Sequence, residues 1–222
     1  DSIIKGNRCG IILLSGILEF KEGTICDSIV GLELDDDKQV QVVNENGETG
    51  TKKTKPINAN VEYATIKNCV AGVYAGVMNK TEEETKVADT AKIYKTNILE
   101  CGSGVDVSGI VKDGSSDATD ASAQEIELRD VKINKCTNGA IVRGTGKVRF
   151  NKVVVSNSCV GYKIIPCSED EAKKTKPKYV TIESNNSNVI KSCINGIDIE
   201  FEVDKDKIAE SVKGIKFNNV DI

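Results

Sequence analysis

The chain of 222 residues contains no histidine and no tryptophan, and it has one methionine and three prolines. The missing histidine excludes Ser-His-Asp and Cys-His nucleophile systems, a histidine general acid or base, and histidine-ligated zinc, haem or iron. Aromatic residues make up only 4% of the sequence, so the core must be built from aliphatic side chains. Much of ordinary enzyme chemistry is therefore excluded before any motif is considered.

The sequence also lacks long runs of one charge sign and long apolar runs. Its 30 Lys and Arg residues against 34 Asp and Glu residues give a net charge of −4, so we expect no nucleic-acid partner and no binding to anionic lipid. No stretch approaches the roughly 18 consecutive apolar residues of a membrane-spanning helix, so we expect no membrane insertion. Asp1-Ser2 stands where a signal peptide would carry a basic region, so a secreted protein would be present here in its mature form.

Eight cysteines are present, none of them in a CxxC pair, which argues against a thioredoxin-like site and a zinc ribbon. Several of them begin a repeated pattern, Cys-x-x-Gly followed by alternating aliphatic residues. The full pattern occurs in residues 65–75, 97–107, 132–142 and 189–199. Shortened copies occur at Cys159-Val160-Gly161 and at Cys9-Gly10. Self-similarity of this kind is typical of repeat architectures.

Each copy predicts a strand of period two, a tight polar turn and a second strand. The cysteines lie 32 (69 to 101), 35 (101 to 136), 23 (136 to 159) and 34 (159 to 193) residues apart, which predicts a basic coil of about 23 residues that is often expanded. The extra residues are polar and follow the second strand each time. They are 79–90, 112–124, 166–178 and 202–213.

These features predict an all-β fold, a single-stranded parallel β-helix of roughly six to eight coils with polar loop insertions on one side. One domain would cover residues 1–222. In its period and its turn pattern the chain resembles the right-handed parallel β-helix superfamily of pectate lyases, phage tailspikes, autotransporter passengers and polymorphic outer-membrane proteins. A β-sandwich is the alternative architecture, because alternating strands alone do not demand repeats in register.

Five cysteines at one repeat position are expected to stack as a column in the turn. Two interpretations remain open: a ladder of buried free thiols, or disulfides between vertical neighbours. Cys26 and Cys167 lie outside the repeat and are candidates for loop-closing disulfides, which would indicate an extracellular setting. The expected column contains Cys69, Cys101, Cys136, Cys159 and Cys193.

Three short motifs are candidates for chemical sites. Asp35-Asp36-Asp37 resembles the clustered carboxylates of polysaccharide-degrading enzymes, but consecutive residues alternate faces on a strand, so we expect a solvated turn. The acidic loop at 113–120 could offer oxygen ligands to Ca²⁺, but its spacing fits no calcium motif. Gly144–Lys147 lacks the rest of a phosphate-loop pattern and is expected to join two strands. We therefore assign no catalytic, cofactor-binding or metal-binding residues, and we expect no cofactor.

The chain begins in what reads as the second half of a repeat and stops in the first half of one, so both ends are expected to be uncapped. Either the chain is a fragment of a longer solenoid, or identical subunits stack head to tail. We expect a non-catalytic structural protein, extracellular or at the cell surface, that self-associates end to end into a fibre or forms part of a longer adhesin or passenger. Carbohydrate and host surfaces are further partners to consider.

The alternative, which comes from the resemblance alone, is a β-helix protein that binds or cleaves polysaccharide, as a lyase or hydrolase. An enzyme of this kind would show a groove lined by carboxylates and basic residues from successive coils, often with aromatic sugar platforms. Such platforms would be sparse in this chain, and we lean against an enzyme. The only tyrosines are Tyr63, Tyr74, Tyr94, Tyr162 and Tyr179.

Overall fold

A computed structural model describes most of the repeat region and leaves out most of the inserted residues. In the described residues all regular structure is β, in three long parallel sheets and one two-stranded sheet. The described residues are 2–14, 16–34, 41–43, 49–51, 57–76, 90–108, 125–144, 147–166, 181–185, 187–200, 215–216 and 220–222.

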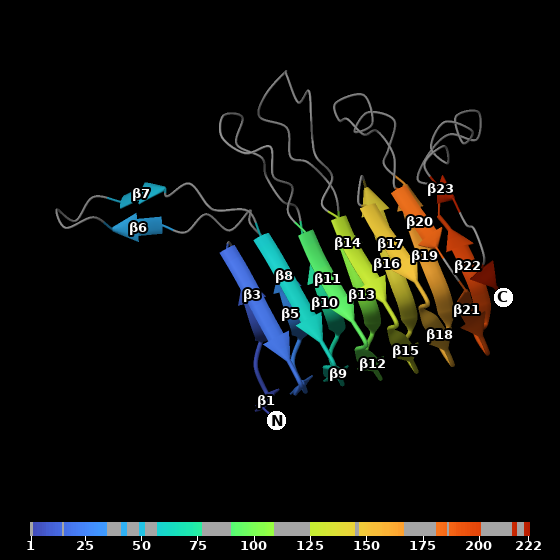
Figure 1. Cartoon of the computed structure of the whole chain (residues 1–222), viewed down its shortest axis with the longest axis horizontal. Coiled ribbons are helices and arrows are strands. Elements are labelled where there is room, and N and C mark those ends of the chain that lie inside the picture. Colours follow the sequence, from blue (N-terminus) through green and yellow to red (C-terminus); the bar gives the residue numbers. More distant parts are fainter. Residues whose placement is uncertain are drawn as a thin grey trace, which may run out of the picture.

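The long sheets run side by side along the molecule (Figure 1). Sheet A contains, in spatial order, β1 (Ser2–Lys5), β4 (Gly23–Cys26), β9 (Thr65–Lys67), β12 (Asn97–Leu99), β15 (Lys132–Asn134), β18 (Val154–Ser156), β21 (Asn188–Lys191) and β24 (Val220–Asp221). Sheet B contains β2 (Cys9–Leu13), β5 (Val30–Leu34), β10 (Ala71–Ala75), β13 (Ser103–Ser108), β16 (Asn138–Gly144), β19 (Val160–Pro166) and β22 (Asn195–Ile199). Sheet C contains β3 (Gly16–Lys21), β8 (Ile57–Glu62), β11 (Thr90–Tyr94), β14 (Glu125–Arg129), β17 (Lys147–Asn151), β20 (Thr181–Asn185) and β23 (Ile215–Lys216).

The chain visits sheets A, B and C in turn, and we call one such passage a coil. Every pairing within the three sheets is parallel and joins one coil to the next; for example, β12 pairs with β9 on one side and β15 on the other. A β-sandwich is excluded, because its sheets are antiparallel. Parallel strands stacked in three sheets are consistent with the expected β-helix solenoid. The antiparallel pair β6 (Gln41–Val43) and β7 (Thr49–Thr51) stands in a separate sheet.

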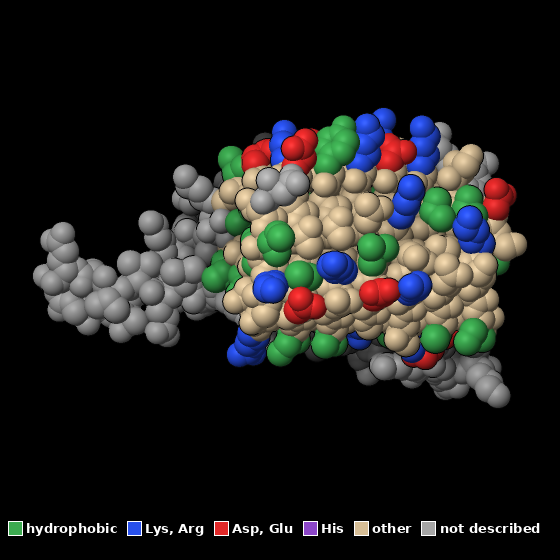
Figure 2. Space-filling view, turned by 90° about the horizontal axis from the view of Figure 1, so that it is seen from below, with side chains coloured by type: hydrophobic (Ala, Val, Ile, Leu, Met, Phe, Trp, Pro, Cys, Tyr) green, Lys and Arg blue, Asp and Glu red, His purple; other side chains and the backbone are tan. Residues whose placement is uncertain are grey.

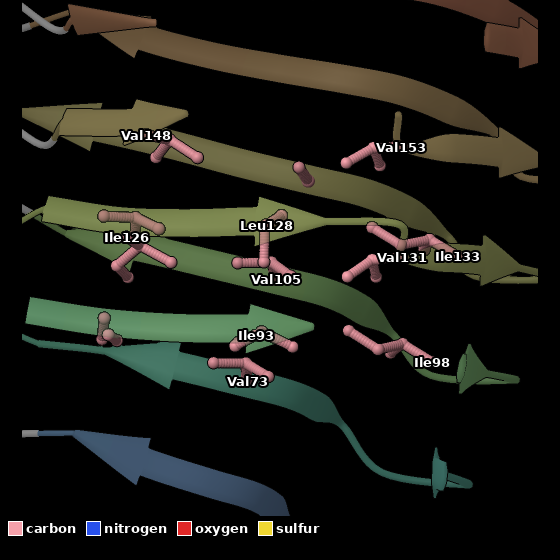
Figure 3. Packing of buried hydrophobic residues seen from close by; sticks show 14 of the residues in the cluster. Val73, Ile93, Ile98, Val105, Ile126, Leu128, Val131, Ile133, Val148 and Val153 are labelled. Carbon is pink, nitrogen blue, oxygen red and sulfur yellow. The ribbon is translucent and has the colours of Figure 1, made fainter. Parts of the chain in front are cut away.

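Equivalent residues of successive coils form columns whose side chains point inward. In sheet A one column contains Ile25, Ile66, Ile98 and Ile133, and all four are fully buried. Strand β8 shows why these segments are strands, because its buried and exposed residues alternate as period two requires. Figure 3 shows side chains of all three sheets meeting in the interior, in rows that follow the coils. The core of the described residues is mostly aliphatic, as expected, but it also contains Phe150 and Tyr162, whose buried rings stack with centroids 4.5 Å apart.

Two of the three corners of the coil are tight turns built around one residue with positive φ. At the corner from sheet A to sheet B, called the A–B corner, these residues are Gly6, Asp27, Asn68, Glu100, Lys135, Asn157 and Ser192. At the corner from sheet C to sheet A, called the C–A corner, they are Glu22, Tyr63, Lys95, Asp130 and Lys152. Each has φ between 45° and 72°. A residue of this conformation turns the chain sharply from one sheet into the next.

The third corner, from sheet B to sheet C, is where coil length varies most. The expected insertions all fall here, between β10 and β11, β13 and β14, β19 and β20, and β22 and β23. Residues 35–56 form a fifth insertion at the same corner, between β5 and β8, which the repeat pattern did not reveal. The coil from Ile133 to Val155 carries no such insertion and spans 22 residues, one fewer than expected.

The beginning of the chain differs from the expectation. Ser2–Lys5 forms β1, which pairs with β4 in sheet A, and β24 near the end of the chain belongs to the same sheet. The two ends therefore do not supply complementary halves of one coil. Both supply a strand of sheet A.

Candidate functional site

The most specialised part of the described molecule is the A–B corner, where a Ser/Cys column comes directly after the positive-φ residues. Each of its side chains donates a hydrogen bond to the carbonyl oxygen two residues earlier, over 3.1–3.6 Å. Local bonds of this kind are typical of serine in turns, and here the thiol does the same. The Ser/Cys column consists of Ser28, Cys69, Cys101, Cys136, Ser158 and Cys193.

The prediction that Cys159 belongs to this column is wrong. Cys159 is exposed, and Ser158 occupies the column position, where its hydroxyl also accepts a hydrogen bond from the Cys136 amide at 3.3 Å. The cause is local: the turn after Ser158 reads Cys159-Val160-Gly161, so the residue three before Gly161 is serine. Counting back from the glycine, instead of aligning the cysteines, would have placed it correctly.

A glycine column lies directly beside the Ser/Cys column. A Cβ atom on Gly72 would lie 2.6 Å from the carbonyl oxygen of Gly104 and 2.7 Å from Cγ2 of Ile98. Contacts this short overlap the van der Waals radii, so only glycine lets the backbones of successive coils approach so closely. The vacant space also accommodates sulfur, because Sγ of Cys101 lies 3.5 Å from the same Cβ position. The column consists of Gly10, Gly31, Gly72, Gly104, Gly139, Gly161 and Gly196.

Three thiols follow one another in successive coils, and we call Cys69, Cys101 and Cys136 the thiol column. They are 4%, 4% and 3% exposed, and all three are free. Contact with the Cys101 thiol raises the pKa of Cys69 far above its usual value, and contact with Cys136 raises the pKa of Cys101 to about 11. The Cys101 contact lowers the pKa of Cys136. Of the two interpretations of the sequence, the structure has the free-thiol ladder.

An open groove of about 640 Å³ runs along the A–B corner and reaches this column at Cys69. Its polar wall includes Asp27 and Asn68, whose side chains are joined by a hydrogen bond of 3.2 Å. That bond lowers the pKa of Asp27. Its apolar residues are Ile29 and Val70, which are exposed.

The C–A corner carries a cluster of aromatic and cationic side chains. The rings of Tyr63 and Tyr94 meet edge to face with centroids 6.1 Å apart. Lys95 lies over both rings, at 5.1 and 4.9 Å from their centroids, and Arg129 lies over Tyr94 at 5.6 Å. We call these four residues the tyrosine–cation cluster. It brings together two of the five tyrosines, a juxtaposition that the sequence did not reveal.

Two ion pairs join successive coils on the outer face of sheet B. Arg143 donates two hydrogen bonds to the Asp106 carboxylate, at 3.0 and 2.7 Å, and Lys163 forms an ion pair with Glu200 at 2.6 Å. Near the first coil the Cys9 thiol donates to Glu33 at 2.8 Å. A bidentate pair is a strong, directional contact between coils. In the described residues these carboxylates stabilise stacking, and they do not converge with the tyrosine–cation cluster.

Figure 2 shows the molecule from the side of sheet A, where charged side chains form rows along the long axis. Between these rows the surface is mainly backbone and uncharged polar side chains. At the A–B corner Lys135 forms an ion pair with Glu100 of the preceding coil at 3.1 Å. Opposite charges on successive coils thus face each other on the outside, as apolar groups do inside.

The motifs considered at the sequence level fall mostly outside the described residues. This applies to Asp35-Asp36-Asp37, to the acidic loop at 113–120 and to Cys167. Gly144 ends β16 and Lys147 begins β17, so the glycine-rich segment joins two strands as expected. Cys26 is a buried free thiol, so the loop-closing disulfide expected for it is not confirmed.

Within the described part of the chain, no group of three or more Cys, Asp or Glu side chains is placed to hold a metal ion. The same residues include no helix that is long and apolar enough to cross a membrane. Compared with protein-family models, curated proteins and solved structures, the chain matches none. The resemblance to β-helix proteins therefore rests on the repeat pattern and on the architecture.

Proposed function

We propose that this chain is a non-catalytic structural β-helix of the extracellular or cell-surface type, whose coils are continued by those of a second copy. The proposal is supported by the two end faces of the stack of coils, at the first and the last described coil. The columns of the core remain apolar at both of them. The extracellular setting is suggested by the resemblance to passenger and tailspike solenoids.

The inward side chains at these faces are only partly buried, whereas their equivalents in the middle coils are almost completely buried. Burying apolar surface of this kind against another surface lowers the free energy by roughly 25 cal/mol per Å². The first face consists of Ile4, Ile11, Leu13, Leu18 and Phe20. The second face consists of Ile197, Ile199 and Val220.

The two faces match in position. Ile11 stands in the same column as Ile197, and Leu13 in the same column as Ile199. A second copy could therefore add β2 to β22 and β3 to β23 by parallel strand pairing. Because β1 and β24 both belong to sheet A, the incoming β1 would replace β24 beside β21. A heterologous contact of this kind repeats without closing and produces a rod.

The test is light scattering and negative-stain microscopy of the 222-residue chain over rising concentration, and we expect rods. Leu13→Asp and Ile199→Asp each block one face, so each variant alone should stop at small species. Their mixture should form dimers through the two intact faces, without rods. Asn97→Asp changes an exposed residue of sheet A and serves as the control. Monomers at every concentration, with circular dichroism of intact β-structure, would contradict the proposal.

Deleting Val220–Ile222 sharpens the same test. If the incoming β1 replaces β24, this deletion should lower the concentration at which rods form. A higher required concentration would show that β24 is part of the interface instead.

A second candidate function, binding of polysaccharide, is favoured by the tyrosine–cation cluster. Tyr63 is 50% exposed, with Lys95 over its ring, and aromatic faces with cations suit acidic sugars. Calorimetric titration with acidic and neutral oligosaccharides tests it. We expect acidic ones to bind and Tyr63→Ala to abolish binding, while Lys152→Ala at the same corner leaves it unchanged. Equal binding by both variants would contradict this function.

A further inference from the structure

The hydrogen bonds of the Ser/Cys column do not require sulfur. Ser28 and Ser158 make the same bond to the carbonyl two residues earlier, at 3.1 and 3.2 Å. Cysteine nevertheless occupies three successive coils, where it forms the thiol column. A role in turn geometry accounts for a hydroxyl or a thiol at each position, but it does not account for an unbroken run of thiols.

The placement of these thiols suits a covalent bond between coils. Ile66, Ile98 and Ile133 are paired in register three residues before each cysteine, and Ala71, Ser103 and Asn138 are paired two residues after. The cysteines therefore repeat at the strand spacing of about 4.8 Å, inside the Cα separation of 4.4–6.8 Å that disulfides span. The neighbouring thiols are close enough to shift the pKa values of Cys69 and Cys101.

We propose that the thiol column is an oxidation site, at which Cys101 forms a disulfide with one of its two vertical neighbours, Cys69 or Cys136. Cys101 is the shared partner, so only one of the two bonds forms in a given molecule and the third thiol stays free. The bond ties two successive coils together inside the turn. Oxidation at this site goes beyond the structural function proposed above and does not depend on it.

The oxidant is a low-molecular-weight disulfide. One thiol of the column loses its proton to solvent, and its thiolate attacks a sulfur of that disulfide, which forms a mixed disulfide and releases one small thiolate that takes up a proton. The neighbouring thiolate of the column then attacks the mixed disulfide, so the bond between coils forms and the second small thiol leaves. Two protein thiols are oxidised and one small disulfide is reduced to two thiols. The groove at Cys69 gives the reagent its approach.

The chain contains its own control. Cys193 occupies the same column with the same backbone bond, but its neighbour toward the N-terminal coils is Ser158. It therefore meets the geometry of the turn without a thiol beside it on that side. If contact between stacked thiols is what matters, Cys193 should stay reduced under conditions that oxidise the thiol column.

The experiment treats the folded full chain with oxidised glutathione, alkylates the remaining thiols and maps tryptic peptides without reduction. Trypsin separates the three cysteines into peptides 68–80, 96–112 and 136–143 and puts Cys193 in 192–205. We expect 96–112 linked to 68–80 or to 136–143, with the third peptide and 192–205 alkylated. Among the described cysteines Cys159 is the one that is exposed, and a Cys159→Ser background removes this thiol, which would otherwise join molecules.

A second measurement uses thermal unfolding. Oxidation should raise the unfolding midpoint of the parent protein and leave that of Cys101→Ser unchanged, while Cys193→Ser should respond like the parent. Cys101→Ser is expected to fold, because serine already serves in two coils of the column. Full alkylation of all three thiols after prolonged oxidation, or equal pairing by Cys193, would overturn the proposal.

Discussion

Each of the two tight corners of the coil contains a residue with positive φ, but the corners differ in the residue that follows it. At the A–B corner the next side chain is serine or cysteine in six described coils, and each of these coils has a glycine shortly after it. At the C–A corner the equivalent inward residues vary in chemistry. They are Gly23, Ala64, Thr96, Val131, Val153 and Asn188, and all are buried.

The difference shows which corner constrains the sequence. At the A–B corner a Cβ atom on a residue of the glycine column would collide with the backbone of the next coil. The close approach of the two backbones therefore requires glycine there. At the C–A corner the inward side chain points into the core, and its size and chemistry differ from coil to coil. A Cβ on Gly23 would meet a side-chain atom first, Cζ of Phe20 at 2.5 Å, and the Ser2 carbonyl oxygen at 3.1 Å. Thr96 makes the bond to the carbonyl two residues earlier that the Ser/Cys column makes, at 3.0 Å, whereas Val131 and Val153 have no donor for it. That bond is therefore optional at this corner.

The comparison is tested most strongly by adding one methyl group at the A–B corner. In Gly104→Ala the new Cβ would lie 2.5 Å from the carbonyl oxygen of Gly139 and 2.6 Å from Cγ2 of Ile133. Because backbone must move, we expect a loss of about 3 kcal/mol in the free energy of unfolding, measured by urea denaturation. Ala64→Val adds more atoms at the C–A corner and should cost less than about 1.5 kcal/mol. Equal costs would show that both corners are packed alike.

Asn188 carries the side-chain amide among the described inward residues of the C–A corner. Asn188 accepts a hydrogen bond from the Val153 amide at 2.8 Å and donates to Ser184 at 2.6 Å, and it is completely buried. Although valine occupies this column in two other coils, we expect Asn188→Val to lose about 2 kcal/mol, because it leaves buried polar groups unsatisfied. Urea denaturation measures the loss. A change below about 0.5 kcal/mol would show that these groups find other partners.

A smaller effect is expected when the thiol column becomes serine. The triple variant Cys69→Ser, Cys101→Ser, Cys136→Ser keeps a donor for each turn, so under reducing conditions its free energy of unfolding should change by less than about 1.5 kcal/mol. The matched triple variant to valine removes all three donors and should lose more. If serine is as damaging as valine, the column is selected for apolar packing and not for its hydrogen bonds.

The smallest effect is a pH dependence at the surface of the A–B corner. The hydrogen bond from Asn68 lowers the pKa of Asp27 in the folded state. A carboxyl with a lowered pKa stabilises the fold above its unfolded-state value of about 3.9, and that stability is lost as pH falls through the folded value. The thermal midpoint of wild type should therefore exceed that of Asp27→Asn at about pH 6, and the gap should shrink below about pH 4. A gap that stays constant would contradict this origin.

The architecture could be predicted from the sequence, because every coil must stack on the next and therefore repeats the same residue pattern. Cys-x-x-Gly at Cys69, Cys101 and Cys136 predicted the A–B corner, and the polar segments predicted where coil length varies. The register was less accessible. Ser28 and Ser158 replace cysteine in the column, so aligning on cysteine hid the coil at 28–34 and misplaced Cys159. The glycine, whose place is set by steric exclusion, is the better marker.

The tyrosine–cation cluster could not be predicted because its members come from different columns. Tyr63 and Lys95 are positive-φ residues of the C–A corner, whereas Tyr94 and Arg129 end strands of sheet C. Their meeting depends on the exact number of residues inserted between coils. The pairing of Asp106 with Arg143 is hidden for the same reason, since 37 residues separate them.

Because the corner from sheet B to sheet C already accepts segments of very different length, foreign peptides could be inserted there. The coil from Ile133 to Val155 closes with only residues 145 and 146 between β16 and β17, yet its neighbours accept many more residues there and keep the same strand pairing. Each doubling of a flexible loop costs only about 0.6 kcal/mol. An epitope or a small binding motif grafted between Gly144 and Lys147 would therefore be carried at a fixed height on the scaffold, with spacing to other grafts set by the coil repeat.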